Sequence, residues 1–354
     1  MTVPAETPAD LRAVTVSSGT RPVFKFQMRF AAIWLALVGL IIFSAIVAPR
    51  SLLPTTIYAI IPLAAFLAIT SAGQAIVLMS RGIDLSIPAI ITLSSTVLLG
   101  FSRGRNEGLV FAIVAALMYA SAVGMINGFL VAVLRLNALI VTLAVGAITA
   151  GATLWYRQGM PPESRVPVAL ADWGGSRFLN LNMAVWVAIL VIVVLTIVLR
   201  KTTIGRRFAA VGANPRAAWI AGINVPIYQI AAFGVAGFLY GIVGILLSAF
   251  IRNPTLLVGD PYLLAPIAAA VLGGTAITGG VGSMIAVGGA ALFLTHLGQM
   301  LRVLGLSTAF QFVIFGVAIA LGMAIAEIKP SQIAYLKKQA MKILGRRQSG
   351  SMPS

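Results

Sequence analysis

Side chains that could carry out acid–base chemistry are scarce in the apolar parts of this chain. Asp84 and His296 are the two ionisable residues within its long apolar runs. No second carboxylate shares a face with Asp84, and no cluster of metal-ligand residues is present. His296 has no acidic neighbour and is expected to be a polar spot in a helix near Gln299. Because ion-coupled carriers more often show ionisable groups inside the membrane, the pattern favours neither such a carrier nor an enzyme.

Asp84 itself allows two interpretations. It lies just before Ser86, at a point where an apolar run is interrupted. Because Asp and Ser are strong helix N-caps, we expect Asp84 to cap a helix that opens near Leu85, with Ser86 accepting a second backbone donor. The alternative is direct contact between Asp84 and a transported solute.

Other polar residues and several glycines are candidates for a pathway or for structural roles. The side chains of Asn127, Asn137 and Thr142 can hydrogen-bond a polyol or tie neighbouring helices together. The glycines expected mainly to allow close helix packing are Gly124, Gly128, Gly146, Gly151, Gly273 and Gly274.

The sequence also lacks two common chemical devices. It has no cysteine, which excludes disulfides and thiol catalysis, and no Gly-x-x-x-x-Gly-Lys-Ser/Thr stretch that would bind a nucleotide. No cofactor or metal is expected. If transport is powered by ATP, hydrolysis must take place on another polypeptide.

One long polar and basic stretch, residues 200–226, interrupts the apolar chain. Its Asn214-Pro215 pair is typical of a helix start, and Gly222 of a helix end, which predicts a short helix over Pro215–Ile223. The small face of this helix suits a grip by another protein, and the alternative is an ordinary basic loop. The residues expected to couple to such a partner are Gly205, Arg206, Gly212, Asn214, Ala217, Ala218, Ala221 and Gly222.

Composition places the chain in a membrane. Hydrophobic residues make up 60% of it, charged residues only 9%, and the mean hydropathy is +1.02. At about 20 apolar residues per span, an all-α protein with about ten transmembrane helices is predicted. The spans are expected at 31–48, 55–79, 83–101, 109–134, 138–156, 183–199, 227–250, 263–277, 284–301 and 307–326.

The distribution of charge sets the expected topology. With the N-terminus inside, 17 of the 25 Lys and Arg residues fall in cytoplasmic segments, which fits an even number of spans and two cytoplasmic termini. Because the basic residues flank spans, the net charge of +17 indicates a membrane surface and not nucleic acid. Spans two to five and seven to ten would form an inverted five-helix pseudo-repeat. The interruptions at Gly82–Ser86 and Gly279–Ser283 offer faint support for it.

The chain is expected to have three parts. Residues 1–30 form a cytoplasmic tail without a signal peptide, and 31–326 the membrane domain. Within that domain, the outside loop 157–182 is a docking ledge for an external partner or a passive connector. The basic tail 327–354 is expected to be cytoplasmic, and its segment 328–347 to lie on the inner leaflet as an amphipathic helix.

Five motifs follow one another between about residue 50 and residue 326. They are Gly82-Ile83-Asp84-Leu85-Ser86; Asn127-Gly128-Phe129-Leu130-Val131 with Leu134-Arg135-Leu136; Thr142-Leu143; Thr203-Ile204-Gly205-Arg206 through Gly222-Ile223-Asn224-Val225; and Ala268-Ala269-Ala270-Val271-Leu272-Gly273-Gly274-Thr275 with Gly279-Gly280. On these motifs the chain resembles the ribose-type permeases of bacterial ABC importers, whose group also contains branched-chain amino-acid permeases.

The resemblance implies a non-enzymatic, multi-pass permease subunit in a bacterial inner membrane. Its implied partners are two cytoplasmic ATP-binding subunits, a second permease copy or homologue, and a periplasmic solute-binding protein that delivers a pentose, a hexose or a polyol-like solute. In that family, the 202–225 region carries the coupling helix that sits in a cleft of the ATPase. A branched-chain amino-acid permease, an ion-coupled secondary carrier and, more remotely, a membrane-embedded enzyme are the alternatives. Leu263 and Ala265 replace an acidic pair common in relatives, so ribose itself is not carried over as substrate.

Overall fold

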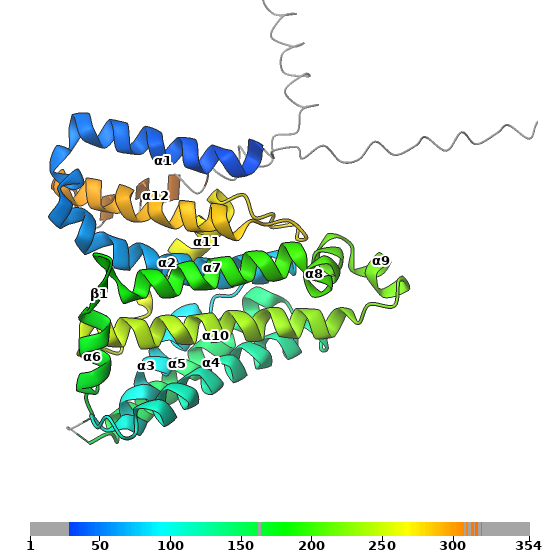
Figure 1. Cartoon of the computed structure of the whole chain (residues 1–354). Coiled ribbons are helices and arrows are strands. Elements are labelled where there is room, and N and C mark those ends of the chain that lie inside the picture. Colours follow the sequence, from blue (N-terminus) through cyan, green and yellow to red (C-terminus); the bar gives the residue numbers. More distant parts are fainter. Residues whose placement is uncertain are drawn as a thin grey trace, which may run out of the picture.

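A computed structural model describes residues 28–161 and 164–307 of the chain, together with 309–310, 313–314, 316–317 and 320. Over these residues the chain is helical apart from turns, connecting segments and one two-stranded hairpin. Long helices run side by side as a bundle, and short elements cover its two ends (Figure 1).

Seven of the described helices are long and apolar enough to cross a membrane. They are α1 (Met28–Val47), α2 (Pro54–Met79), α4 (Leu109–Ala132), α5 (Ala138–Gln158), α7 (Met183–Lys201), α10 (Val225–Ile251) and α12 (Met284–Val303). Two apolar helices are shorter, α3 (Ile87–Ser102) and α11 (Ala265–Leu272). Short 3-10 turns, η1 (Pro49–Leu52) and η2 (Asp260–Tyr262), precede α2 and α11. The all-α membrane class is therefore confirmed.

Nine of the ten predicted spans coincide with these helices, but two of them are shorter than predicted. The span predicted over 83–101 begins at Ile87, because residues 80–86 are not helical and Pro88 stands in the first turn of α3. The span predicted over 263–277 ends at Leu272, where Gly274 takes a left-handed φ of 81°.

The remaining topological predictions lie largely outside the described residues. The predicted tenth span at 307–326, nearly all of the tail 1–30 and the whole tail 327–354, with its amphipathic helix, belong to this group. The count of ten spans and the cytoplasmic termini therefore stay predictions.

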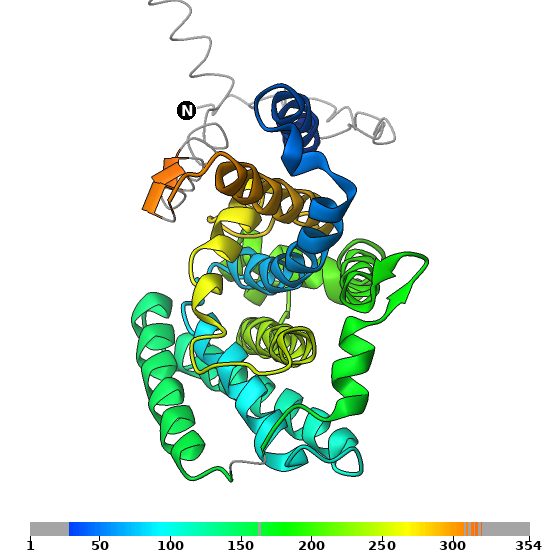
Figure 2. The same cartoon turned by 90° about the vertical axis from the view of Figure 1, so that its left-hand side faces the viewer.

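Helices α2 and α10 occupy the interior of the bundle, as Figure 2 shows in a view along the helices. Helix α4 packs closely along α10, because glycines remove side chains from the contact. A Cβ atom on Gly124 would lie 2.2 Å from the carbonyl oxygen of Phe233, and one on Gly128 would lie 2.7 Å from Cα of Ile230. These glycines are packing residues as predicted. Gly151 makes no such contact with the described residues, none of which has an atom within 4 Å of its Cβ position.

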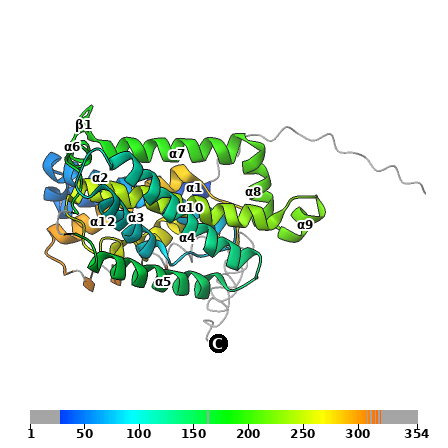
Figure 3. The same ribbon diagram turned by 90° about the horizontal axis from the view of Figure 1, so that it is seen from below.

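The two polar loops lie at opposite ends of the bundle (Figures 1 and 3). One end carries α6 (Val168–Gly175) and the antiparallel hairpin of β1 (Arg177–Phe178) and β2 (Leu181–Asn182), in which Phe178 pairs with Leu181. The other end carries α8 (Thr203–Ala213) and α9 (Pro215–Ile220). This arrangement agrees with the prediction that loops 157–182 and 200–226 face opposite sides of the membrane.

The similarity between the interruptions at 82–86 and 279–283 does not support an inverted repeat. The backbone N–H of Gly280 donates to the carbonyl oxygen of Met79 at 2.9 Å, so the two interruptions lie side by side. Equivalent breaks in an inverted repeat would instead lie on opposite sides of the membrane, because the repeat reverses each helix. The pseudo-repeat itself stays a prediction.

Candidate functional site

Among the predicted pathway residues, the most deeply buried polar side chains lie at a break between two helices. Helix α2 ends at Met79, residues 82–86 run without helical structure, and α3 starts at Ile87. The side chains of Asp84 and Ser86 are completely buried. One carboxylate oxygen of Asp84, Oδ1, accepts hydrogen bonds from the backbone N–H of Ser86 at 2.8 Å and from its Oγ–H at 2.6 Å.

Two neighbouring helices complete this group, which we call the Asp84 cluster (Asp84, Ser86, Asn127 and Thr142). Asn127 on α4 donates from Nδ2 to the Ser86 hydroxyl at 2.8 Å. Thr142 on α5 accepts from the backbone N–H of Leu85 at 3.0 Å and donates to the carbonyl oxygen of Ala138 at 2.8 Å. The cluster therefore ties the break to two other helices. It brings together four residues that the sequence predicted separately.

The details of helix capping differ from the prediction. The N-cap residue of α3 is Ser86, and Asp84 accepts the N–H of that cap residue from two positions earlier. The Ser86 hydroxyl accepts from an amide side chain, Asn127, and not from a backbone donor. Within the described part of the chain, Oδ2 of Asp84 and Oδ1 of Asn127 have no hydrogen-bond partner. Two buried acceptor atoms thus remain available in the cluster.

Three other predicted pathway residues do not join the cluster. Asn137 is exposed and caps α5, where its side chain accepts from the N–H of Leu139 at 2.9 Å. Gly273 is a packing residue, because its Cβ position lies 2.7 Å from Cα of Val287. Gly274 is buried and has a positive φ directly after the end of α11, so it is also a turn residue.

His296 has a structural partner on another helix. Its Nε2 atom lies 3.0 Å from Oγ of Ser44, which joins α12 to α1. The sequence analysis missed a second internal link, in which Tyr240 on α10 donates to Oε1 of Gln74 on α2 at 3.3 Å. The only signal for this link in the sequence was Gln74, an amide in the middle of an apolar run.

The basic stretch 200–226, in which one short helix was predicted, contains two helices, α8 and α9. Thr202 caps α8 by accepting from the N–H of Gly205 at 3.1 Å, and the buried Phe208 and Val211 form its inner face. Helix α8 was not predicted, although the Thr202 cap and this spacing of apolar residues were a usable signal. Arg206 lies on its exposed face, whereas Gly205 and Gly212 are buried.

The predicted short helix is present as α9 and has the expected ends. Asn214 accepts from the N–H of Ala217 at 3.1 Å, and Pro215 occupies the first turn. Gly222 takes a φ of 79°, and its N–H donates to Trp219 O while that of Ile223 donates to Ala218 O. These two bonds form a Schellman ending, for which glycine is the favoured residue.

The exposed face of α9 matches the predicted alanine face only in part. Ala217 and Ala221 are exposed, but Ala218 is only 4% exposed and packs within this chain. A six-residue helix that lies on its own subunit must turn one side inward, and Ala218 is on that side. Trp219 and Ile220 face outward instead, with 71% and 79% of their surfaces exposed.

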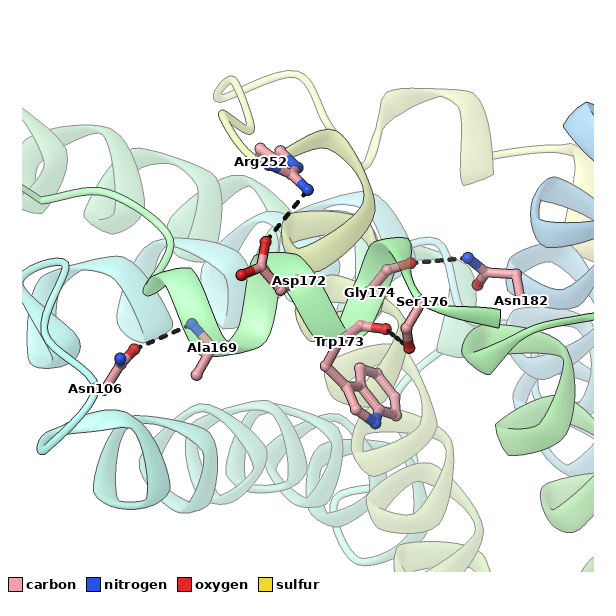
Figure 4. Close-up of polar contacts among 8 residues, drawn as sticks. All are labelled: Asn106, Ala169, Asp172, Trp173, Gly174, Ser176, Asn182 and Arg252. Atoms are coloured by element: carbon pink, nitrogen blue, oxygen red, sulfur yellow. Dashed lines mark hydrogen bonds and ion pairs between the residues drawn. The ribbon is translucent and has the colours of Figure 1, made fainter. Parts of the chain in front are cut away.

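The opposite end of the bundle is an ordered ledge (Figure 4). Asn106 accepts from the N–H of Ala169 at 3.1 Å, Arg252 pairs with Asp172 at 3.5 Å, and Asn182 donates to Gly174 O at 2.8 Å. These contacts hold α6 against the ends of the long helices. The loop that was predicted to lie outside is thus packed on the bundle.

Comparison with known proteins identifies the family. The family model described as "Branched-chain amino acid transport system / permease component" matches residues 56–326. The chain belongs to this permease family. The match begins in α2 and includes α8, α9 and the whole Asp84 cluster.

Individual relatives resemble the permease over most of its length. The ribose import permease protein of Bacillus subtilis is 31% identical and covers 82% of this chain and 90% of its own. The ribose import permease protein of Escherichia coli K12 is also 31% identical, over 84% and 95%. The L-arabinose ABC transporter permease protein of Azospirillum brasilense is 29% identical, over 87% and 90%.

Proposed function

We propose that this chain is the membrane permease subunit of an ATP-driven importer that takes up a sugar delivered by a binding protein. The observation that carries the proposal is the similarity to ribose and arabinose import permeases over at least 90% of their own lengths. A transport subunit also agrees with seven apolar helices long enough to cross a membrane and with the absence of a nucleotide-binding P-loop from the sequence.

The α8–α9 segment supports docking of a separate ATPase. It lies outside the predicted spans at the end of the bundle, where it cannot be covered by the hydrocarbon core. Trp219 and Ile220 are nevertheless exposed there, and an exposed aromatic–aliphatic pair is typical of an interface anchor. We therefore assign the ATPase contact to Trp219 and Ile220, with Ala217 and Ala221 beside them.

The Asp84 cluster supports an uncharged solute with several hydroxyl groups. Among the described residues, Asp84 and His296 are the buried acidic and basic side chains, while serine, threonine and amide side chains are numerous. Hydroxyl and amide groups exchange hydrogen bonds with a polyol without the desolvation of an ion. The two free acceptors of the cluster, on Asp84 and Asn127, are suited to hydroxyl donors. A branched-chain amino acid carries two charges. Among the described residues, the cluster offers a carboxylate for its ammonium group but no basic group for its carboxylate.

The complete importer needs further chains. The ledge formed by α6 and the β1–β2 hairpin is the proposed contact for the binding protein, since it lies at the end opposite α9. A second permease copy or a homologue completes the membrane part. The assembly works in a bacterial inner membrane.

Uptake by proteoliposomes tests the proposal. We expect sugar uptake with the permease, its ATPase, the binding protein and ATP, and none with the permease alone under a proton or sodium gradient. Uptake driven by either gradient without ATP would contradict the proposal. Uptake of leucine or isoleucine in place of ribose, arabinose and other sugars would support the branched-chain alternative.

A further inference from the structure

Three backbone segments that are far apart in sequence meet at the C-terminal end of α8. They are Met79–Arg81 at the end of α2, Gly212–Ala213 at the end of α8, and Gly279–Gly280 in the loop before α12, and we call this contact the Arg81 junction. Figure 1 shows that loop reaching the end of the bundle where α8 lies. The N–H of Gly280 donates to Met79 O at 2.9 Å, which joins two of the segments directly.

The side chain of Arg81 binds the third segment. Its Nε–H donates to the carbonyl oxygen of Gly212 at 2.7 Å, and Nη2 donates to that of Ala213 at 2.5 Å. These are the last carbonyl groups of α8, where the helix dipole is negative and a cation is favourable. The planar guanidinium reaches both oxygens at once, which a single ammonium group cannot do in the same way.

The backbone of Arg81 has an unusual conformation for this purpose. Its φ is 70°, and it ends α2 in a position that glycine usually occupies. A left-handed arginine is less stable than glycine there. Arg135 shares the positive φ, so the conformation alone assigns no role. What distinguishes Arg81 is the pair of hydrogen bonds from its side chain to the last carbonyl oxygens of α8.

The junction leaves no room for independent movement. A Cβ atom on Gly212 would lie 2.0 Å from Met79 O and 2.5 Å from the Gly280 nitrogen, so backbone packs directly on backbone. Each segment also leads into a functional element. Arg81 precedes the Asp84 cluster by three residues, Gly212–Ala213 precedes the cap of α9, and Gly279–Gly280 lies in the break between α11 and α12.

We propose that Arg81 is a positioning residue that transmits displacement of α8 and α9 to both helix breaks, the one before α3 and the one between α11 and α12. The inference rests on the proposed docking of an ATPase to α9. A movement of α9 then changes the interior of the permease, because α8, which supports α9, is clamped to the chain at both of these breaks. Without the clamp, α8 moves and the breaks do not follow.

The test uses the assembled importer with Arg81→Ala and Arg81→Lys. For Arg81→Ala we expect the ATPase to co-purify normally. The maximal rates of binding-protein-stimulated ATP hydrolysis and of uptake should both fall by about tenfold. The concentration of binding protein that gives half the maximal rate should stay unchanged. Arg81→Lys keeps the charge and should recover part of the rate. The matched control is Arg135→Ala, which removes an exposed arginine that also has a positive φ and forms no hydrogen bond or ion pair with the described residues. It should behave like the unaltered importer.

Spin labels give a second readout, because the natural chain has no cysteine. Labels at Ala210 on α8 and Ile277 in the loop before α12, both exposed, should keep one distance in the nucleotide-free and ATP-bound importer. In Arg81→Ala this distance should change between the two states. Equal behaviour of Arg81→Ala and the unaltered chain, or loss of ATPase binding in Arg81→Ala, would overturn the proposed transmission. An unaltered importer that takes up sugar without the ATPase would instead overturn the proposed function.

Discussion

Asp84 is a buried carboxylate whose partners are neutral. Oδ1 accepts two hydrogen bonds from Ser86, and the described residues supply no basic group in an ion pair with it. An amide oxygen can accept the same two bonds, so the geometry requires an acceptor at this position more than it requires a charge.

Substitution of Asp84 separates these two requirements. Asp84→Asn should leave uptake and thermal stability close to normal. Asp84→Leu should lower both, because the buried N–H of Ser86 loses its acceptor at about 1–3 kcal/mol. Thermal unfolding of the purified permease and proteoliposome uptake provide the measurements. The control is Asp172→Asn, which alters an exposed ion pair worth less than about 1 kcal/mol. If Asp84→Asn proves as harmful as Asp84→Leu while the protein still folds, the negative charge itself is needed.

Individual residues of the site were predicted with mixed success. Asp84, Ser86, Asn127 and Thr142 were found because polar side chains stand out in apolar runs, and the structure joins them. Their mutual contacts could not be predicted, since they depend on which faces of three helices meet. Arg81 was missed for a related reason. Its role depends on carbonyl groups 131 and 132 residues away in sequence.

At the scale of elements, long helices were predicted well and short ones poorly. Hydropathy detects a run of about 20 apolar residues, which is why α4, α5 and α7 begin at the predicted residues. Helices α6 and α8 are short and mixed in composition, so their stability comes from packing on the bundle and not from a span-length apolar run. The same reason explains why Ala218 was wrongly placed on the partner-facing side of α9.

The corrected face of α9 makes a specific prediction about its partner. Changing both Trp219 and Ile220 to alanine should leave the permease folded, because these side chains are exposed. It should weaken the ATPase contact by about 2 kcal/mol or more, equivalent to about thirtyfold in affinity, if both residues are interface anchors. Co-purification of the ATPase and sugar-stimulated ATP hydrolysis are the measurements.

Two further variants serve as controls for α9. Val168→Ser removes another exposed apolar side chain, at the opposite end of the molecule, and should not alter ATPase binding. Ala218→Glu introduces a charge into a buried contact and is expected to damage the permease itself, so a loss of coupling there is not informative. Normal ATPase binding by the Trp219 and Ile220 double variant would place the docking site elsewhere.

At the scale of the whole molecule, the membrane class followed from composition, whereas the arrangement of interrupted helices did not. Apolar composition reports the total length of chain in the bilayer but not where a helix stops inside it. Helices α3 and α11, at 16 and 8 residues, are too short to span alone, and each adjoins a non-helical segment. Those segments meet at the Arg81 junction, next to the α8–α9 end. The difference between the two ends of the bundle therefore arises from the tertiary structure.

The orientation of the whole permease is the last testable consequence. Basic residues are concentrated in the segments assigned to the cytoplasm, including α8 and the tail after residue 326, and ten spans place both tails on the side of α8. Single cysteines can be introduced into the naturally cysteine-free chain at Ser17, Asn180, Ala210 and Ser349. Only the cysteine at position 180, in the β1–β2 hairpin, should react with a membrane-impermeant maleimide applied to spheroplasts. The other three should react only after permeabilisation. Labelling of position 349 from outside, with positions 17 and 210 still protected, would establish an odd number of spans and remove the ten-span topology.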